Sequence, residues 1–304
     1  ECATNGNPNA RTISAGTTQK FWQPEFVGDK IGLCWKDLDS TFLVWGRKNG
    51  IQASDLTGTD FLLWIESLLT PALKEMILRL FYFGDKDAEL IADGGVVTAG
   101  TNLTFVNRIN GVWKQFFAIV SADATRKTVV TGTTNTITSK NASASYALQA
   151  FNGTDTSELM VTKTLTQMTE QADSRLMAKA TKRFYVTKSV YDQYKRELKF
   201  ANVSFTTERI ENGILVLSAD GVELVMVEFW DRMIKVLYNT GAKLHLPHRI
   251  VLATPENLQL ATEEEVNLSD YSVENVSHLD TTFVKTGMQL DAKVVIDHEV
   301  QLAY

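Results

Sequence analysis

One segment in the first third of the chain has apolar residues at the spacing of a helix. Between Thr59 and Phe83 they recur every three or four residues, which predicts a helix with one buried face. Thr59 or Asp60 can cap its start, and Gly84 follows where a terminating glycine is common. Pro71 leaves open whether this helix runs unbroken, kinks or divides. The predicted buried positions are Phe61, Ile65, Leu68, Leu69, Ala72, Leu73, Met76 and Leu80.

A helix of this length is either the spine of an elongated domain or a core helix of another α/β or α+β protein. Similar spacing predicts a second helix over residues 102–120 and a short one over residues 189–198. Another helix is expected to open at Asp155, where Glu158 completes a capping box. The Thr- and Ser-rich residues 121–148 are predicted to form an extended or β-rich surface segment.

Alternating apolar and polar residues predict a hairpin over residues 29–55, just before the long helix. Ile31, Leu33 and Trp35 would share one side of its first strand, and residues 48–50 carry a turn signal. This segment has no obvious sheet to join. It is therefore either an ordinary edge hairpin or a protruding loop that packs on a neighbouring subunit.

The second half of the chain carries further strand signals. Residues 182–187 predict one strand, and residues 248–258 predict a buried strand that enters a turn. Asp220 and Gly221 form a two-residue turn signal between two apolar runs. Alternation from Leu290 to Leu302 predicts a strand far longer than the usual five or six residues. Because these segments come from distant regions, an α+β fold is expected.

Composition favours a globular protein. The chain has 304 residues, of which 44% are hydrophobic and 22% charged, enough for one large or two modest domains. Its net charge of -6 and pI near 5.4 argue against a surface wrapped in nucleic acid, which requires a basic stripe.

The first 28 residues differ from the rest. They are rich in Asn, Thr, Gly and Ala without periodicity, so residues 1–28 are predicted to be an extended arm. Phe21, Trp22 and Phe26 add large apolar groups that dock on a partner or on the chain's own body. The sequence begins at Glu1 rather than Met, so either a precursor segment is removed or the sequence is part of a longer product.

No catalytic motif emerges from the sequence. It contains no phosphate-binding loop, dinucleotide fingerprint, nucleophile elbow or zinc-protease helix motif. His245 and His248 have ligand-like spacing, but Pro247 between them opposes a helix. Residues 297–299 (Asp-His-Glu) are expected to alternate on a strand, with solvated carboxylates opposite a core histidine. Residues 263–265, all Glu, are expected to be a solvated surface. We therefore expect no catalytic residues, cofactor or metal.

Cysteines and sequons add little. Cys2 and Cys34 are too few for a disulfide framework, and free thiols are expected over a single bridge tying down the arm. No signal peptide or transmembrane segment is predicted. Sequons that would suit a glycosylated secreted protein occur at Asn102, Asn141, Asn152, Asn202, Asn267 and Asn275, but the chain is rich enough in Ser and Thr to produce several by chance.

The order of several blocks in the second half resembles major capsid proteins of tailed bacteriophages with the Hong Kong 97 fold, most closely versions from phages of Bacteroidetes-type hosts. The resemblance covers most of residues 56–304 and rests on loose patterns of hydrophobicity and turns. The blocks are KRFYVTKSVYDQYKREL (182–198), NGILVLSADGVELVMVEFWD (212–231), PHRIVLATPENLQ (247–259) and TTFVKTGMQLDAKVVIDHEVQLAY (281–304).

This resemblance implies an α+β Hong Kong 97-type fold and assigns a part to each stretch of the chain. The implied parts are an N-terminal arm (1–28), an extended loop (29–55), a peripheral domain with a spine helix at 59–83 (56–149 and 270–304) and an axial domain (150–269). Side chains of the arm and loop would contact neighbouring subunits. The expected contact residues are Phe21, Trp22, Phe26, Lys30, Trp35, Lys36, Trp45, Arg47 and Lys48.

The resemblance also implies a structural role rather than an enzymatic one. Copies of the chain would assemble through hexamers and pentamers into an icosahedral shell around phage double-stranded DNA, without sequence-specific DNA contacts or a membrane. Implied partners are a portal, a scaffolding protein or maturation protease, and decoration proteins. The virion capsid, assembled in the host bacterial cytoplasm, would be its location. The alternatives are an encapsulin-type nanocompartment shell and, from another class, a secreted surface-binding protein.

Overall fold

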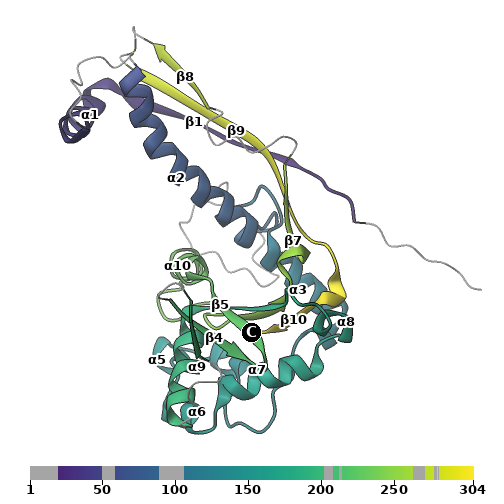
Figure 1. Cartoon of the computed structure of the whole chain (residues 1–304). Coiled ribbons are helices and arrows are strands. Elements are labelled where there is room, and N and C mark those ends of the chain that lie inside the picture. Colours follow the sequence, from purple (N-terminus) through teal and green to yellow (C-terminus); the bar gives the residue numbers. More distant parts are fainter. Residues whose placement is uncertain are drawn as a thin grey trace, which may run out of the picture.

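One long strand, β9 (Thr281–Val294), links the two parts of the computed structural model, an arm and a body (Figure 1). It runs the length of the arm, and the chain then continues into the body as β10 (Val300–Ala303). The structure describes residues 20–49, 59–88, 106–201, 208–211, 214–262, 271–276, 279 and 281–304.

The body is built on a six-stranded mixed sheet. The sheet has the order β10-β6-β2-β5-β4-β3, so strands that are distant in sequence are neighbours in space. β2 runs parallel to β5 and antiparallel to β6. The bounds of the remaining strands are Arg183–Val186 (β2), Glu208–Glu211 (β3), Ile214–Ala219 (β4), Val222–Met226 (β5) and Ile250–Ala253 (β6).

Two hydrophobic clusters cover the two faces of this sheet. Along β6, Val251 and Ala253 belong to one cluster, whereas Ile250 and Leu252 belong to the other. This division follows from the alternation of side chains along a strand, and all four residues are fully buried. Helices supply the opposing layers: α3 (Val112–Ala122) and α10 (Glu228–Leu237) on one face, α7 (Met160–Gln171) and α9 (Lys188–Phe200) on the other.

Short elements connect these layers. They are a 3-10 turn (Ala124–Arg126), α4 (Ile137–Ala142), α5 (Tyr146–Gln149), α6 (Gly153–Ser157), α8 (Ser174–Met177) and two further 3-10 turns (Pro255–Asn257 and Asp297–Glu299).

The arm is a four-stranded antiparallel sheet backed by a long helix (Figure 1). β9 pairs with β1 on one edge; on the other it pairs with β8 near the tip and β7 near the body. The helix α2 runs beside this ribbon from tip to body. The bounds are Glu25–Cys34 (β1), Leu258–Ala261 (β7), Tyr271–Val276 (β8), Trp35–Asn49 (α1) and Thr59–Phe83 (α2).

Two separate hydrophobic clusters hold the arm together. The tip cluster joins α1, α2 and β9, and its buried members are Phe42, Phe61, Trp64, Ile65 and Val284. The base cluster joins α2 and the ribbon near the body, and its buried members are Val27, Leu80, Ile109, Leu290 and Ala292.

The long helix is confirmed, and it passes through Pro71 as one element. Its buried face differs from the predicted one. Trp64 is buried, whereas Leu68 is 56% exposed and Ala72 is also exposed. The reason is that the helix contacts three clusters in succession, the two clusters of the arm and, through Phe83, one cluster of the body, so no single stripe of positions remains buried along its length.

The predicted hairpin over residues 29–55 is wrong. Its first part is a strand, β1, but residues 35–49 form α1 instead, and residues 50–55 lie outside the described part of the chain. Phe42 is fully buried because it packs edge-on to Phe61, with ring centroids 5.4 Å apart. Four residues on, Gly46 is also buried, which is the spacing of a helix face.

Two other helix predictions are corrected. The second helix starts at Val112 rather than near residue 102, after Gly111 donates to the carbonyl oxygen of Gly84 at 2.7 Å and closes against the end of α2. The segment 121–148 is not β-rich, since it contains short helices. One of these, α4, begins with a capping box between Thr136 and Ser139.

The helix expected to open at Asp155 is divided in two. Asn152 and Asp155 form the capping box of α6, and Glu158 instead accepts from the backbone nitrogen of Thr134 at 2.6 Å. Leu159 then adopts a left-handed conformation (φ 54°), and α7 begins at the next residue. The predicted helix over 189–198 is confirmed as α9, which starts one residue earlier.

The long terminal strand is also divided. β9 ends at Val294, and the side chain of Asn257 accepts from the backbone nitrogen of Ile296 at 2.7 Å and donates to its carbonyl oxygen at 2.9 Å. This clamp turns the chain out of the arm sheet into the body sheet. Glu299 is consequently buried rather than solvated, and it pairs with Lys179 at 2.9 Å. His298 is half-buried and does not enter the core.

The remaining strand predictions are confirmed. The turn at Asp220 and Gly221 joins β4 to β5 with positive φ at both residues (50° and 75°), the conformation that matches strand twist. The strand over 182–187 is β2, and the buried strand near 250 is β6.

Glu197 lies fully buried beneath the start of α7. It accepts from the backbone nitrogens of Val161 (2.9 Å) and Thr162 (2.8 Å), which have no partner within their own helix. We expect Glu197→Ala to lower the free energy of unfolding by about 3 kcal/mol, because both donors lose their acceptor inside the body. Urea unfolding measures this.

The matched control is Glu170→Ala, at an exposed position near the end of α7, the helix whose start Glu197 caps. It should change the unfolding free energy by less than about 0.5 kcal/mol. Equal losses for the two variants would contradict the capping role of Glu197.

Candidate interaction surface

The chain enters the arm as a strap held by side chains. Residues 20–24 belong to no helix or strand, and they cross the base of the arm before β1 begins. Lys20 donates to the carbonyl oxygen of Val294 at 2.7 Å and forms an ion pair with Asp297. The backbone nitrogen of Gln23 donates to Asp291 at 2.9 Å. These contacts tie the strap to β9 and the turn that follows it.

A further ion pair holds Glu25, the first residue of β1, at the point where the strap ends. Glu25 lies 2.7 Å from the Lys86 ammonium, and both side chains are largely exposed. The Lys86 hydrogen bond and charge lower the pKa of the Glu25 carboxyl. Exposed pairs of this kind contribute at most about 1 kcal/mol each and weaken in salt. The strap is therefore fastened much more weakly than β1, which is paired along its whole length with β9.

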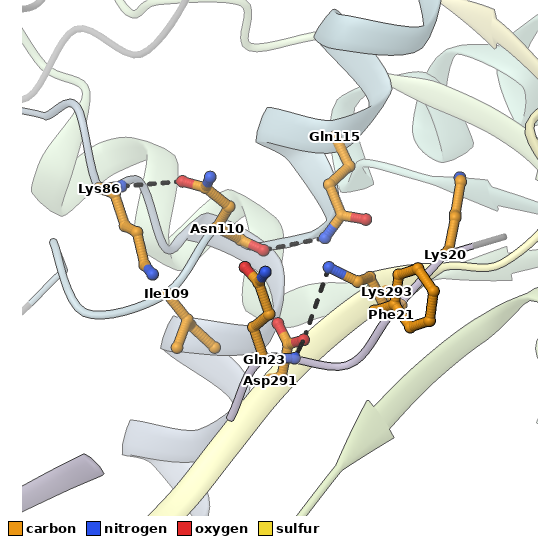
Figure 2. A pocket seen from close by; sticks show the side chains of 9 residues that line it. All are labelled: Lys20, Phe21, Gln23, Lys86, Ile109, Asn110, Gln115, Asp291 and Lys293. Atoms are coloured by element: carbon orange, nitrogen blue, oxygen red, sulfur yellow. Dashed lines mark hydrogen bonds and ion pairs between the residues drawn. The ribbon is translucent and has the colours of Figure 1, made fainter. Parts of the chain in front are cut away.

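Beneath the strap lies a hollow of about 300 Å³ (Figure 2). Gln115 closes one wall: it donates to the carbonyl oxygens of Asn110 (2.9 Å) and Ala292 (2.6 Å) and accepts from the nitrogen of Val294 (2.9 Å). The hollow is lined by Lys20, Phe21, Gln23, Lys86, Ile109, Asn110, Gln115, Asp291 and Lys293. Its charges are balanced, because each lysine has an acidic partner.

Three of the five aromatic residues predicted to contact neighbours lie on the surface. Phe21 is 69% exposed, Phe26 60% and Trp22 40%. Phe21 lines the hollow, and Phe26 lies on the open face of the ribbon. The exposure of these large apolar side chains leaves them available for such a contact, and their contact with a neighbouring subunit stays a prediction.

The other predicted contact residues follow the arm toward its tip. Lys30 is exposed, with its ammonium 4.3 Å from the ring centre of Phe283. Trp45 is only half-buried and stacks on Phe42 in the tip cluster. Lys36, Arg47 and Lys48 are exposed on α1. The side chain of Trp35 lies outside the part of the chain that the structure describes. The contacts of these residues with another subunit stay a prediction.

Sequence reasoning missed a second set of exposed apolar residues on the arm. Leu62, Leu63 and Leu68 on α2 are 38%, 50% and 56% exposed, and Val44 on α1 is 54% exposed. The pattern alone assigned Leu68 to the buried face and ignored the others. Two leucines in succession at positions 62 and 63 were the available signal, because a helix cannot bury both against one narrow neighbour.

The buried polar groups of the body are structural. His248 is 4% exposed; its Nε2 donates to the carbonyl oxygen of Gln149 (2.8 Å), so its Nδ1 accepts from the Ser189 hydroxyl (2.7 Å). Burial lowers the pKa of this imidazole to about 4, which makes it a poor base. Asn141 closes on the backbone of the same residue through two hydrogen bonds. The side-chain amide of Asn141, one of the sequon asparagines, is therefore buried in the body.

Arg249 is a second buried group without a catalytic setting. Its guanidinium lies 4.5 Å from the ring centre of Trp113 and 5.7 Å from that of Tyr238. It donates to the carbonyl oxygen of Leu246 at 2.8 Å. Burial lowers its pKa to about 10, so the group stays charged at neutral pH. Among the described residues no carboxylate forms an ion pair with it, and the aromatic rings stabilise the cation instead.

The described residues include no cluster of His, Cys, Asp and Glu that could hold a metal ion. None of the described helices is long and apolar enough to cross a membrane. Cys34 is an exposed free thiol, and Cys2 lies outside the described residues, as do Glu263–Glu265.

Stability should fall in mild acid because of His248. The buried histidine, with a pKa near 4, becomes protonated at a lower pH than the same histidine in the unfolded chain, whose pKa is about 6.5. Its contribution is complete above pH 6.5 and is lost as pH falls toward 4. From pH 7 to pH 5 this amounts to about 2 kcal/mol. Measured by urea unfolding, the loss of unfolding free energy between pH 7 and pH 5 should be smaller in His248→Gln than in the parent protein by that amount. Equal losses in the two proteins would contradict this role of His248.

The strap should open in salt while β1 stays paired. Raising ionic strength from about 0.01 M to about 1 M shortens the Debye length from roughly 30 Å to roughly 3 Å. We expect faster amide hydrogen exchange at residues 20–24 and little change within β1, measured by mass spectrometry. Lys86→Gln should raise exchange in the strap at low salt. Lys235→Gln, on the exposed face of α10, should leave it unchanged. A strap insensitive to both salt and Lys86 would contradict the electrostatic fastening.

Comparisons with known proteins establish the fold of this chain. No protein-family model matches the chain, and no curated protein does. Among solved structures, the satellite phage P4 procapsid including size determination (Sid) protein is similar over 98% of this chain and 85% of that chain, with a TM-score of 0.52 and 14% identity.

Two other solved structures are similar at lower scores. The bacteriophage PhiM1 mature capsid covers 97% of this chain and 79% of that chain (TM-score 0.44, 11% identity). The holo-SrpI encapsulin complex from Synechococcus elongatus covers 93% and 74% (TM-score 0.42, 9% identity). The likeness to the P4 procapsid chain establishes the fold: this chain has the α+β, Hong Kong 97-like capsid fold.

Proposed function

We propose that this chain is the major capsid protein of a tailed phage, a structural subunit without enzymatic activity. Copies of it assemble through hexamers and pentamers into the icosahedral shell that encloses the double-stranded DNA of the virion. The observation that carries the proposal is the likeness over 98% of the chain to a subunit of the satellite phage P4 procapsid. The sequence blocks quoted above support it independently and suggest a host of the Bacteroidetes type.

The shape of the molecule suits this task. The arm projects from the body (Figure 1), so one copy can lie over another. It displays apolar side chains that its own fold leaves uncovered, among them Leu63 and Leu68 on α2 and Phe26 on β1. Each such contact is weak, but a closed shell repeats it in every subunit, and the contributions add.

The parts of the subunit follow from this proposal. The strap is part of the N-terminal arm (1–28). The helix α2 is the spine of the peripheral domain (56–149 and 270–304), and most of the body is the axial domain (150–269). The fold does not separate these ranges sharply, because Ile137 packs in one cluster with Met160 and Ala303. Residues 29–55, proposed as the extended loop, include β1 and α1 rather than a hairpin.

Partners follow in the same way. A portal, a scaffolding protein or maturation protease, and decoration proteins would meet the shell during or after assembly. The packaged DNA would be enclosed without sequence-specific contacts, which agrees with the net charge of -6.

Electron microscopy of the purified chain, with light scattering for mass, tests the proposal. Closed shells of uniform diameter, or rings of five and six, are expected. A monomer at every concentration, with and without scaffolding partners, would contradict it. Shells recovered from host cells should contain double-stranded DNA. Shells filled with enzyme cargo instead would favour the encapsulin alternative.

A surface variant tests the arm separately. Leu63→Gln keeps a good helix former at a half-exposed position, so the fold should keep its stability within about 0.5 kcal/mol. Assembly yield should fall, because the arm loses an apolar contact. Val129→Gln, at a 67% exposed position of the body, is the matched control and should assemble normally. Normal yield from Leu63→Gln, or an equal defect in the control, would remove this face of the arm from the proposed contacts.

A further inference from the structure

A small hollow of about 10 Å³ lies where the arm meets the body. Phe83, the last residue of α2, and Gly84 line one side of it, and Trp113 and Lys114 line another from the first turn of α3. Arg249, the residue before β6, lines it from the body. A volume of this size holds one water-sized atom. We call this space the arginine hollow.

The guanidinium of Arg249 carries more hydrogen-bond donors than its neighbours accept. The residue is 1% exposed. Its Nε donates to the carbonyl oxygen of Leu246 at 2.8 Å, and its Nη2 to that of His245 at 3.4 Å. A guanidinium has five N–H groups, so the others have no acceptor among the described residues. Because buried donors nearly always have a partner, these N–H groups indicate a bound species in the hollow.

The indole of Trp113 supplies a further donor without an acceptor. Trp113 lines the same hollow and is 2% exposed, and its Nε1 has no hydrogen-bond partner among the described residues. The face of its ring is already in contact with a cation, since the Arg249 guanidinium lies 4.5 Å from the ring centre. The N–H at the ring edge needs a different partner, and that partner must be an acceptor.

The charges around the hollow favour an anion over a water molecule. Lys114 pairs with Asp85 at 3.2 Å and with Asp87 at 3.4 Å, so one lysine engages both carboxylates. Arg249 has no acidic partner among the described residues, and burial lowers its pKa only to about 10, so it stays positive. The N-cap residue of α3, Gly111, has no side chain that could accept from the first turn. The helix dipole therefore adds positive potential at the same place.

We propose that the arginine hollow binds a single halide ion, with chloride as the natural ligand, between the Arg249 guanidinium and the Trp113 indole N–H. The ion supplies both the negative charge that the guanidinium lacks and an acceptor for the two sets of donors. Carboxylates and phosphates are too large for a hollow that holds one atom. The bound ion joins the end of α2, the start of α3 and the residue before β6. This site belongs to the single chain and does not depend on the proposed function.

Bromide, a heavier halide, can locate the site directly. Crystals of the chain soaked in sodium bromide should show an anomalous scattering peak within hydrogen-bond distance of the Arg249 guanidinium. A water molecule in the hollow gives no such peak. Peaks at exposed lysines with none in the hollow would mean an adventitious ion only, and they would overturn the proposal.

Urea unfolding measures the binding of chloride in solution. Sodium chloride replaces sodium gluconate, whose anion is too large for the hollow, at constant ionic strength. A ligand of one site on the folded chain raises the folding equilibrium constant by up to about tenfold for each tenfold rise in its concentration. The urea midpoint should therefore rise as chloride replaces gluconate. Equal midpoints in the two salts would overturn the proposal.

Three variants assign the chloride response to this hollow. Trp113→Phe removes the N–H but keeps an aromatic ring, so it should weaken the response. Arg249→Met removes the charge and should abolish the response. The matched control is Trp230→Phe: the indole N–H of Trp230 is also buried without a partner among the described residues, but it does not line the hollow, so the response should stay complete.

Circular dichroism confirms that each variant is folded. The parent response in both Trp113→Phe and Arg249→Met, or an equal loss in the control, would overturn the proposal. Should Arg249→Met fail to fold, Trp113→Phe decides alone, and an undiminished response in it would overturn the site. Assembly plays no part in these measurements, so their result is separate from the test of the proposed function.

Discussion

The arm depends on the pairing of one strand with three others. Every residue of β9 has a partner in β1, β7 or β8, and these come from distant parts of the chain. A ribbon of two strands is marginal in water, whereas this sheet gains a third strand at each end and a helix across its inner face. Val284 and Leu290 are buried only because α2 covers them. Without β9, neither the tip cluster nor the base cluster would form.

The body stays in register with the arm through Asn257. Its amide satisfies both the N–H and the carbonyl of Ile296, at the point where the chain leaves one sheet for the other. Buried polar groups elsewhere serve similar local purposes. Glu197 holds the start of α7, and His248 holds the end of α5 at Gln149. Their unusual environments arise from burial within a packed interior, which is why they form no reactive site.

Local signals predicted much of the fold. The turn at Asp220 and the bounds of the helix from Thr59 to Phe83 were both predicted, because each is fixed by residues close in sequence, whereas its continuity through Pro71 was left open. Residues 35–49 were mistaken for a strand because a short apolar run suits either period, and the burial of Phe42 against α2 decides between them. The break after Val294 was hidden for a similar reason: alternation continues through it, and the clamp comes from a residue far away in sequence.

The candidate surface was predictable in part. Large aromatic residues in the otherwise polar N-terminal segment (residues 1–28) predicted exposed side chains, and Phe21 and Phe26 are indeed exposed. The exposed leucines of α2 were missed because a single helical stripe was assumed, whereas the helix packs into three clusters in succession. The strap and its hollow were out of reach, since they join Lys20 and Glu25 to residues from three other segments.

The pairing of Glu25 with Leu290 has a consequence for synthesis. A ribosome releases β1 early and β9 only after most of the chain has been made, so β1 waits without its partner. Contacts between such distant segments close slowly and late. The body can gather most of its helices and strands before the arm exists, and the edge strand β10 joins them only afterwards. Translation order therefore delays the projecting part of the molecule until nearly the whole polypeptide is present.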